Sequence, residues 1–388
     1  MLPSMTSESR AGRRALGRAL LGGRVMAADW APTFAAVDRA AFLPDLMWPF
    51  DTRTHVATPV HRGEDPGAWY AAADRDAPIV TQWDDGEHTG TEPGRVSSSS
   101  SSMPSVVYAL LQDLTVDDGM TVLDVGTGTG ETAAALAHRC GRRRGHHCRG
   151  GPRRIAAGGR AAPRRRVAPG RRRGRRSRGA RGPRTVRPRA GDRGGPYDPR
   201  GVDRADPPRR PHRRALGTHF THADAVARLT VRKGTASGRF TRPVEFMKLR
   251  SQRPALLDHG AYDPTDGADT AATDLTEAEF VTGPYSALPF VLGLRVPHCV
   301  QVVAEREDGA RPVWFYGLGD RSWACVVFRE DKARARVWQA GPRRLWDEVE
   351  GAYRWWQARG APDHTRFGLT VTPDGHRVWL DDPAVTVP

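Results

Sequence analysis

The chain of 388 residues carries 60 basic and 44 acidic side chains, which gives a formal net charge of +16. Because a single hydrophobic core stops growing at roughly 250–300 residues, this length predicts more than one domain. No stretch reaches the ~18 consecutive apolar residues of a membrane span, and the N-terminus lacks the residue order of a signal peptide. We therefore expect a soluble, cytoplasmic protein without a membrane partner.

The basic excess is confined to one block. Residues 142–214 contain 27 arginines, no lysine and four aspartates, a net charge of +23, while the rest of the chain has 33 basic and 40 acidic residues. An arginine cluster can neutralise phosphates, so a nucleic-acid or polyanion binder is one interpretation. Tyr197 is the only aromatic residue of the block, which leaves no stacking platforms for bases and disfavours specific nucleic-acid recognition.

The N-terminal part predicts helices separated by a long loop. Apolar residues recur at helical spacing between Arg13 and about Asp51, with breaks at Gly22–Gly23 and Pro32, so we expect two helices there. Residues 51–95 are rich in Asp, Gly and Pro and lead into the run Ser97–Ser102, which predicts a loop. A short helix, a buried strand and an alanine-rich helix are expected next, over Val106–Leu114, Thr121–Val125 and Glu131–Cys140.

Residues 142–216 lack both large apolar residues and periodicity. Such a composition cannot bury enough apolar surface to offset chain entropy, so we expect this segment to be disordered. The four cysteines, Cys140, Cys148, Cys299 and Cys325, form no CxxC pair and no zinc-ligand spacing. Neither a disulfide framework nor a metal site is therefore expected.

From Gly217 onward the alternation of apolar and polar residues predicts mostly strands. Strands are expected over Ala227–Val231, Val244–Leu249, Phe290–Leu294, Cys299–Ala304, Val313–Tyr316, Trp323–Phe328, Ala335–Trp338, Phe367–Val371 and Arg377–Leu380. Pro373-Asp374-Gly375 predicts a hairpin turn, and about Pro342–Arg359 predicts an amphipathic helix. A sheet with a helix packed on it would form an α+β C-terminal domain over residues 276–388.

The segment Val122–Gly130 carries the main chemical signal. An apolar strand would end in a Gly-x-Gly-x-Gly turn formed by Gly126, Thr127, Gly128, Thr129 and Gly130, with Asp124 just before it. The missing side chains would let the backbone approach a ligand closely, and the next helix would point its first amides at the same place. A nicotinamide or flavin site is disfavoured because the spacing is not GxGxxG and the acid precedes the first glycine. We expect S-adenosylmethionine (AdoMet), and a purely structural turn remains the alternative.

The motifs resemble the protein-L-isoaspartate O-methyltransferase family, particularly actinobacterial members with a C-terminal extension. The resemblance rests on Phe34–Pro44, Ser101-Ser102-Met103-Pro104, the glycine turn, Gly217-Thr218 and Arg239–Leu249. It implies a doubly wound, Rossmann-like α/β domain over residues 96–250, after N-terminal helices and a loop over residues 1–95. It also implies O-methylation of an isoaspartyl or aspartyl carboxylate in a protein or peptide substrate, with Asp124 and the turn holding AdoMet.

Ser102 is the candidate catalytic residue. In the family, a pattern like T-I-S-x-P places a serine or threonine beside the methyl-accepting carboxylate, and Ser102 stands two residues before Pro104. The alternative is a flexible serine linker whose last member only caps the following helix. The family also needs an acid about 20 residues beyond the turn for the ribose hydroxyls, and no acidic residue occurs between Arg142 and Ala190.

A shifted reading frame accounts for that missing acid. Codons for Gly145–Arg154, read one base later, permit V-T-T-V-E-V-D-P-A-V, a buried strand ending in an acid. Codons for Gly201–Arg210 permit A-W-I-E-Q-T-R-P-G-G in the same frame, and His212–Ala215 permits T-V-A-P. We hypothesise compensating frame changes near Gly141 and Leu216, which leaves an inactive pseudoenzyme as the alternative to an active methyltransferase. The sequence leaves the oligomeric state open.

Overall fold

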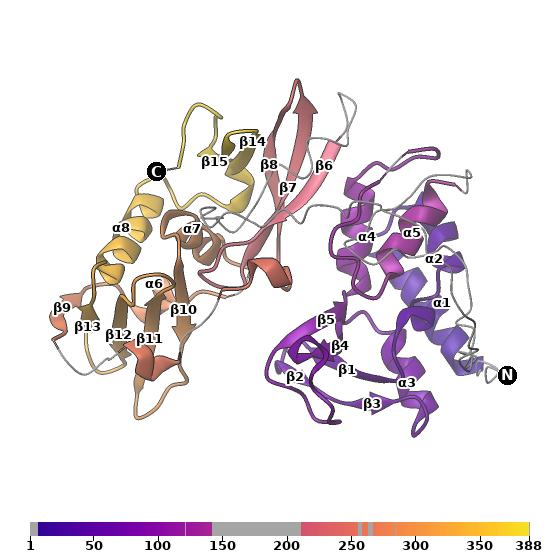
Figure 1. Cartoon of the computed structure of the whole chain (residues 1–388), viewed down its shortest axis with the longest axis horizontal. Helices are drawn as coiled ribbons and strands as arrows, with labels where there is room; N and C mark the ends of the chain where they lie inside the picture. Colours follow the sequence, from indigo (N-terminus) through magenta and orange to yellow (C-terminus); the bar gives the residue numbers. More distant parts are fainter. Residues whose placement is uncertain are drawn as a thin grey trace, which may run out of the picture.

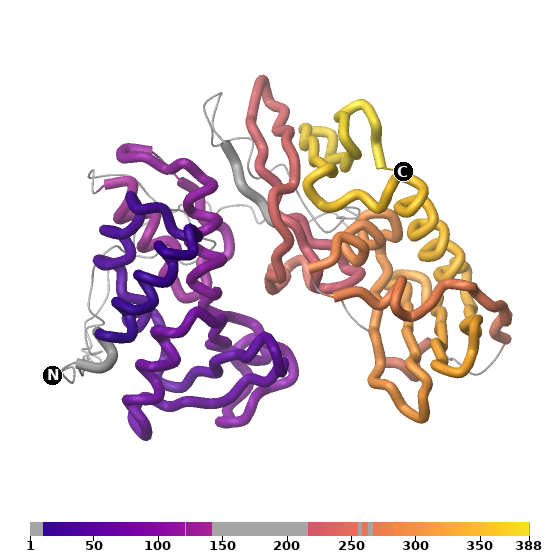
Figure 2. Tube along the Cα trace, turned by 180° about the vertical axis from the view of Figure 1, so that it is seen from behind, coloured from indigo at the N-terminus to yellow at the C-terminus, as the bar shows by residue number. Residues whose placement is uncertain are grey.

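The computed structural model describes residues 7–120, 122–141, 211–254, 258–262, 267–283 and 285–387, with only the backbone of residues 7–10 and 211–215. Figures 1 and 2 show two lobes in these ranges, an N-terminal lobe up to residue 141 and a C-terminal lobe from residue 211. Most of the segment predicted to be disordered, residues 142–210, lies outside the described residues. In the part of the chain that is described, no helix is long and apolar enough to cross a membrane.

Helices form one layer of the N-terminal lobe. They are α1 (Ser7–Gly22), η1 (Ala28–Trp30), α2 (Ala31–Ala36), η2 (Arg39–Phe42), α4 (Pro104–Asp113) and α5 (Glu131–Arg139). Their apolar faces meet in a core that includes Leu20, Trp30, Tyr108 and Leu136. The predicted helices near Val106–Leu114 and Glu131–Cys140 are confirmed as α4 and α5.

A small antiparallel sheet forms the other layer of this lobe, where the sequence predicted the end of a helical stretch, up to about Asp51, and then a loop. Its strands are β1 (Leu46–Asp51), β2 (Val56–Ala57), β3 (Val60–His61), β4 (Ile79–Trp83) and β5 (Ser97–Ser101), with α3 (Pro66–Ala73) and η3 (Asp84–Gly86) between them. The serine run is β5 because it pairs with β4, from Ile79 opposite Ser101 to Trp83 opposite Ser97. Cross-strand pairing overrides the weak strand propensity of serine, so the loop prediction for Ser97–Ser102 is wrong.

The C-terminal lobe contains two antiparallel sheets. One has the order β10-β11-β12-β13-β9, from β9 (Asp269–Thr273), β10 (Cys299–Val303), β11 (Ala310–Gly317), β12 (Trp323–Arg329) and β13 (Ala335–Ala340). The other has the order β15-β14-β8-β7-β6, from β6 (Pro211–Leu216), β7 (Asp224–Arg232), β8 (Thr235–Val244), β14 (Phe367–Thr372) and β15 (Gly375–Leu380). Because β8 pairs with β14, residues 211–244 share a sheet with the end of the chain.

Helices pack on these sheets as the sequence predicted for an α+β domain. They are α6 (Glu277–Phe280), α7 (Ala287–Arg295) and α8 (Leu345–Gln357), with η5 (Arg250–Gln252), η6 (His259–Tyr262) and η7 (His364–Arg366) in the connections. The core of the first sheet and α8 buries Phe315, Val337, Trp346 and Tyr353. The mixed helix-and-sheet fold class and the sheet-rich C-terminal domain are confirmed; the described residues contain no parallel strand pair.

Three local predictions in the C-terminal lobe are corrected. Phe290–Leu294 belongs to α7 rather than a strand, because a short apolar run has no distinguishing period and the Ser286 side chain accepts a hydrogen bond from the Leu288 amide at the helix start. No strand forms over residues 245–249, where one was predicted from Val244 to Leu249, because β8 already ends at Val244. Pro211–Leu216, placed at the end of the disordered segment, forms β6. The hairpin at Gly375, which has φ +144°, is confirmed between β14 and β15.

A buried carboxylate in this lobe gives the stability a pH dependence. Asp224, at the start of β7, is 3% exposed and accepts a hydrogen bond from Lys248 Nζ at 2.5 Å. Burial raises the pKa of Asp224 from 3.8 to about 6, against the opposing effect of Lys248. The folded state therefore binds this proton more tightly than the unfolded chain does.

The contribution of Asp224 to stability should consequently fall as the pH rises. It is complete below about pH 4 and is lost by about pH 6, a change of about 2–3 kcal/mol in the free energy of unfolding. Asp224→Asn removes the titration, so the unsubstituted chain should lose stability relative to this variant between pH 4 and pH 7. Urea unfolding of both proteins, followed by circular dichroism at each pH, measures the difference. Parallel pH profiles would contradict this assignment.

Candidate functional site

The glycine turn adopts a backbone that requires its glycines. Gly126, Gly128 and Gly130 have φ values of +80°, +54° and +98°, in the left-handed region that side chains disfavour. Gly130 is the N-cap of α5 and supplies no side-chain cap. The first amides of α5 are therefore left for another acceptor, as in an anion- or ligand-binding helix start.

Two buried polar atoms of the turn, Asp124 Oδ2 and Thr127 Oγ1, have no hydrogen-bond partner outside the turn. Burial raises the pKa of Asp124, and a hydrogen bond from the Thr127 side chain opposes that rise. A carboxylate oxygen that is not fully paired costs free energy when it is buried, so these atoms fit a ligand that brings its own donors. The amino and hydroxyl groups of AdoMet are such donors, and the residues present fit that cofactor.

The segment before the turn is not the buried strand that the sequence predicted. Val122–Val125 has no regular secondary structure, and Leu123 and Val125 are 44% and 61% exposed. A single extended segment becomes a strand only when a neighbour satisfies its backbone groups and covers its side chains. No described strand pairs with residues 122–125. The strand prediction is therefore wrong for these residues, because no described neighbour pairs with them or covers them.

The structure brings the predicted serine run and the glycine turn together. A side chain at Gly128 would lie 3.4 Å from the Ser100 carbonyl oxygen and about 4.0 Å from Ser99 Oγ. One residue further along β5, Ser101 is 3% exposed and its hydroxyl donates to Glu131 Oε2 at 3.0 Å. Through both contacts, the serine run, where the methyl acceptor is predicted to bind, meets the glycine turn and the start of α5, where the cofactor is predicted to bind.

Ser102 follows β5 directly and is half-buried. The N-cap of α4 is Met103, and the Ser105 amide in its first turn donates to Asp76 Oδ1 at 2.8 Å, so the interpretation of Ser102 as a helix cap is wrong. The Ser102 carbonyl accepts a hydrogen bond from Arg39 at 3.0 Å. Its role as catalytic residue stays a prediction.

Two charged residues of this site were not predicted from the sequence. Arg39, in η2, is 1% exposed, and Glu131 is the first residue of α5. Their side chains form an ion pair with Nε and Oε2 3.6 Å apart. Burial raises the pKa of Glu131, and the Arg39 guanidinium opposes that rise. Arg39 stands inside the string Phe34–Pro44 that carried the resemblance, but only the fold reveals what it contacts.

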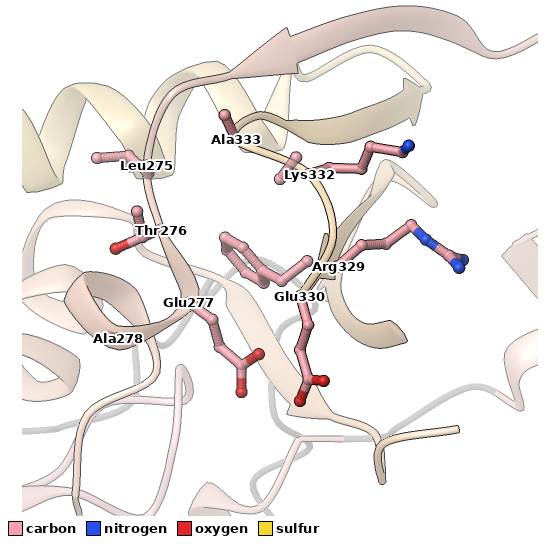
Figure 3. Close-up of a pocket in the computed structure, with 10 residues that line it drawn as sticks. Leu275, Thr276, Glu277, Ala278, Arg329, Glu330, Lys332 and Ala333 are labelled. Carbon is pink, nitrogen blue, oxygen red and sulfur yellow. The ribbon is translucent and has the colours of Figure 1, made fainter. Parts of the chain in front are cut away.

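A hollow in the C-terminal lobe is a second candidate site (Figure 3). Its lining residues come from α6, the preceding loop, and the connection between β12 and β13: Leu275, Thr276, Glu277, Ala278, Phe328, Arg329, Glu330, Lys332, Ala333 and Ala335. Glu277 and Glu330 pair with Arg306 at 2.6 and 2.9 Å, and Arg329 and Lys332 pair with Asp331. These charges satisfy one another at the surface, so the hollow gives no signal for a ligand.

The cysteines give no sign of a metal centre. Cys299 and Cys325 are buried, and burial raises the pKa of both thiols to about 12. Within the described ranges, no group of three His, Cys, Asp or Glu side chains could hold a metal ion. Cys148 and the stretch in which an acid for the ribose was sought lie outside the described residues.

The comparisons with known proteins point to the same segment. Residues 86–146 match the family model of Protein-L-isoaspartate(D-aspartate) O-methyltransferase (PCMT). A search of curated proteins finds no match. A solved structure titled protein-L-isoaspartate O-methyltransferase is 15% identical, with a TM-score of 0.39, over 95% of this chain and 100% of that chain. That likeness is too weak to carry an argument of its own. Through the segment with its serine run and glycine turn, the chain resembles the protein-L-isoaspartate O-methyltransferase family.

Proposed function

We propose that this protein is an AdoMet-dependent O-methyltransferase that esterifies an isoaspartyl or aspartyl carboxylate in a protein or peptide. One observation carries the proposal: the glycine turn, in which Asp124 Oδ2 has no partner outside the turn, lies against the serine run that ends at Ser102. The family match over residues 86–146 supports it. A cytoplasmic location stays a prediction.

The chemistry asks the protein mainly to position two reactants. AdoMet, when bound, supplies a methyl group on a sulfonium. The acceptor is already a carboxylate, so no proton has to be removed from it and the site gains its rate from orientation and exclusion of water. In this proposal Asp124 and the turn amides hold the cofactor, and Ser102 orients the acceptor carboxylate through its hydroxyl.

A second candidate is that the chain as written is an inactive product of a frame change. The exposure of Leu123 and Val125 supports this alternative, because no described strand packs over the segment that leads into the cofactor turn. The nucleic-acid interpretation rests on the arginine block alone, most of which lies outside the described residues. Affinity for AdoMet separates an active enzyme from an inactive one.

Ser102→Ala should lower methyl transfer without weakening cofactor binding. The expected loss is about 100-fold in kcat, because misplacing one reactant by about 1 Å costs that much.

We expect isoaspartyl peptides to be preferred over matched aspartyl peptides by at least about tenfold in kcat/KM. Release of labelled methanol from the ester measures transfer to both peptides.

Ser105→Ala, three residues later on α4, is the matched control and should transfer methyl groups at the unsubstituted rate. Equal rates for Ser102→Ala and Ser105→Ala would remove Ser102 from the site. Binding of AdoMet without transfer to either peptide would instead reject the proposed acceptor.

A further inference from the structure

Arg39 is saturated with hydrogen bonds although it is almost completely buried. Its Nε donates to Ser101 Oγ at 2.8 Å, and its terminal nitrogens donate to five backbone carbonyls. These carbonyls belong to Ala73, Arg75, Ala77, Ser101 and Ser102 and lie at 2.9–3.3 Å. A guanidinium has five donors in a rigid plane and reaches all six acceptors because Nη2, with two N–H groups, is shared among three carbonyls. No other side chain can satisfy this set.

Glu131 supplies the counter-charge from the cofactor side. Its Oε2 lies 3.6 Å from Arg39 Nε and accepts the Ser101 hydroxyl at 3.0 Å. The Ser101 hydroxyl thus stands between the two charges, accepting from Arg39 and donating to Glu131. Because the side chains of Arg39 and Glu131 are only 2% and 13% exposed, removing either charge leaves the other buried without its nearest counter-charge.

The geometry links two segments that the reaction must hold in a fixed relation. Glu131 follows Gly130 directly, so it moves with the cofactor turn. Arg39 donates hydrogen bonds to the carbonyl oxygens of Ser101 and Ser102, so it fixes the backbone of Ser102. The described residues place no other ion pair between η2 and α5.

We propose that Arg39 and Glu131 are positioning residues that set Ser102 against the cofactor turn. This inference rests on the proposed function, because it names what aligns the acceptor serine with the cofactor. Neither residue needs to touch substrate. Their substitution should therefore lower kcat while leaving the KM for peptide and the Kd for AdoMet nearly unchanged.

The test uses the full chain with Glu131→Gln, Arg39→Lys and the double variant. Glu131→Gln keeps an acceptor for Ser101 but loses the charge, and should lower kcat about tenfold with KM changed less than twofold. Arg39→Lys keeps the charge but has three donors for six acceptors, and should lower kcat about 100-fold. The double variant should lose no more than Arg39→Lys alone, because both substitutions break one unit.

Hydrogen–deuterium exchange provides a readout that does not require activity. Arg39→Lys should lower protection about tenfold both in residues 99–103 and in residues 127–133, although these segments lie on different elements. Glu277→Gln and Arg306→Lys are matched controls, since this partly exposed pair in the other lobe makes the same kind of contact at 2.6 Å. These controls should leave kcat and both protected segments unchanged.

The outcomes separate this inference from the proposed function. Failure of the unsubstituted chain to transfer methyl groups counts against the proposed function for this chain, and the exchange experiment then decides the inference. Folded variants with unchanged kcat, or exchange that changes in only one of the two segments, would overturn the positioning role. A lower melting temperature with unchanged kcat in the folded fraction would also overturn the positioning role. An ion pair that only stabilises the fold would give this result.

Discussion

Restoring the reading frame of residues 142–216 is expected to raise the affinity of the chain for AdoMet by about 30- to 150-fold. The segment before the cofactor turn leaves Leu123 and Val125 44% and 61% exposed, and no described strand pairs with it. Fully burying a leucine or valine is worth about 1.5–3 kcal/mol, so partial recovery at both positions contributes about 2–3 kcal/mol. If the glycine turn binds AdoMet only when residues 122–125 are paired with neighbouring strands, this free energy is added to the free energy of AdoMet binding.

The measurement is a calorimetric titration of the chain as written and of the restored chain with AdoMet and with its demethylated product. A chain carrying the restored segment in scrambled order has the same composition and should bind no better than the chain as written. Affinities of the restored and unrestored chains within about threefold of each other would refute the frame-change hypothesis. Resequencing the gene tests the same hypothesis independently of binding.

Trp346→Ala should destabilise the C-terminal lobe by about 3–5 kcal/mol, the usual cost of removing a buried tryptophan. Trp346 is 2% exposed, and its ring contacts Phe280 and Phe315 at centroid distances of 5.5 and 5.8 Å. Its indole N–H donates to Glu350 Oε2 at 2.9 Å. The substitution therefore leaves both a cavity and an unpaired acceptor.

Urea unfolding followed by circular dichroism measures this effect. Trp346→Phe keeps an aromatic ring but loses the donor, so about 1–2 kcal/mol is expected. Tyr285→Ala removes an aromatic side chain that is 71% exposed, and should change stability by less than about 0.5 kcal/mol. A loss below about 1 kcal/mol for Trp346→Ala would show that this residue does not hold α8 on its sheet.

Helices with a clear apolar period could be predicted from the sequence because the period is a local property. Glu131–Cys140 and about Pro342–Arg359 correspond to α5 and α8 within a few residues. The Gly375 hairpin was equally predictable, because its turn requires a residue that tolerates positive φ. Phe290–Leu294 was not, since five apolar residues suit a buried helix or a buried strand equally well.

The candidate site was predictable only in part. The glycines and Asp124 stand in one short string, so their proximity follows from covalent connection. Arg39 is separated from Ser101 by 62 positions, and nothing in the local sequence says that its guanidinium ends among the carbonyls of β5. The serine run was predicted to be a loop because serine has a weak strand propensity. It forms a strand because it pairs with β4.

The sequence by itself determined the position of the glycine turn, the strongest helices, the confinement of basic charge to residues 142–214 and the resemblance to a methyltransferase family. The tertiary structure decided that Ser97–Ser101 is a strand, that Arg39 and Glu131 join it to the turn, and that Leu123 and Val125 lie exposed. The physical reason is the range of the interactions. Backbone conformation and periodicity act over a few residues, whereas strand pairing, ion pairing and burial depend on partners that the chain brings from far away.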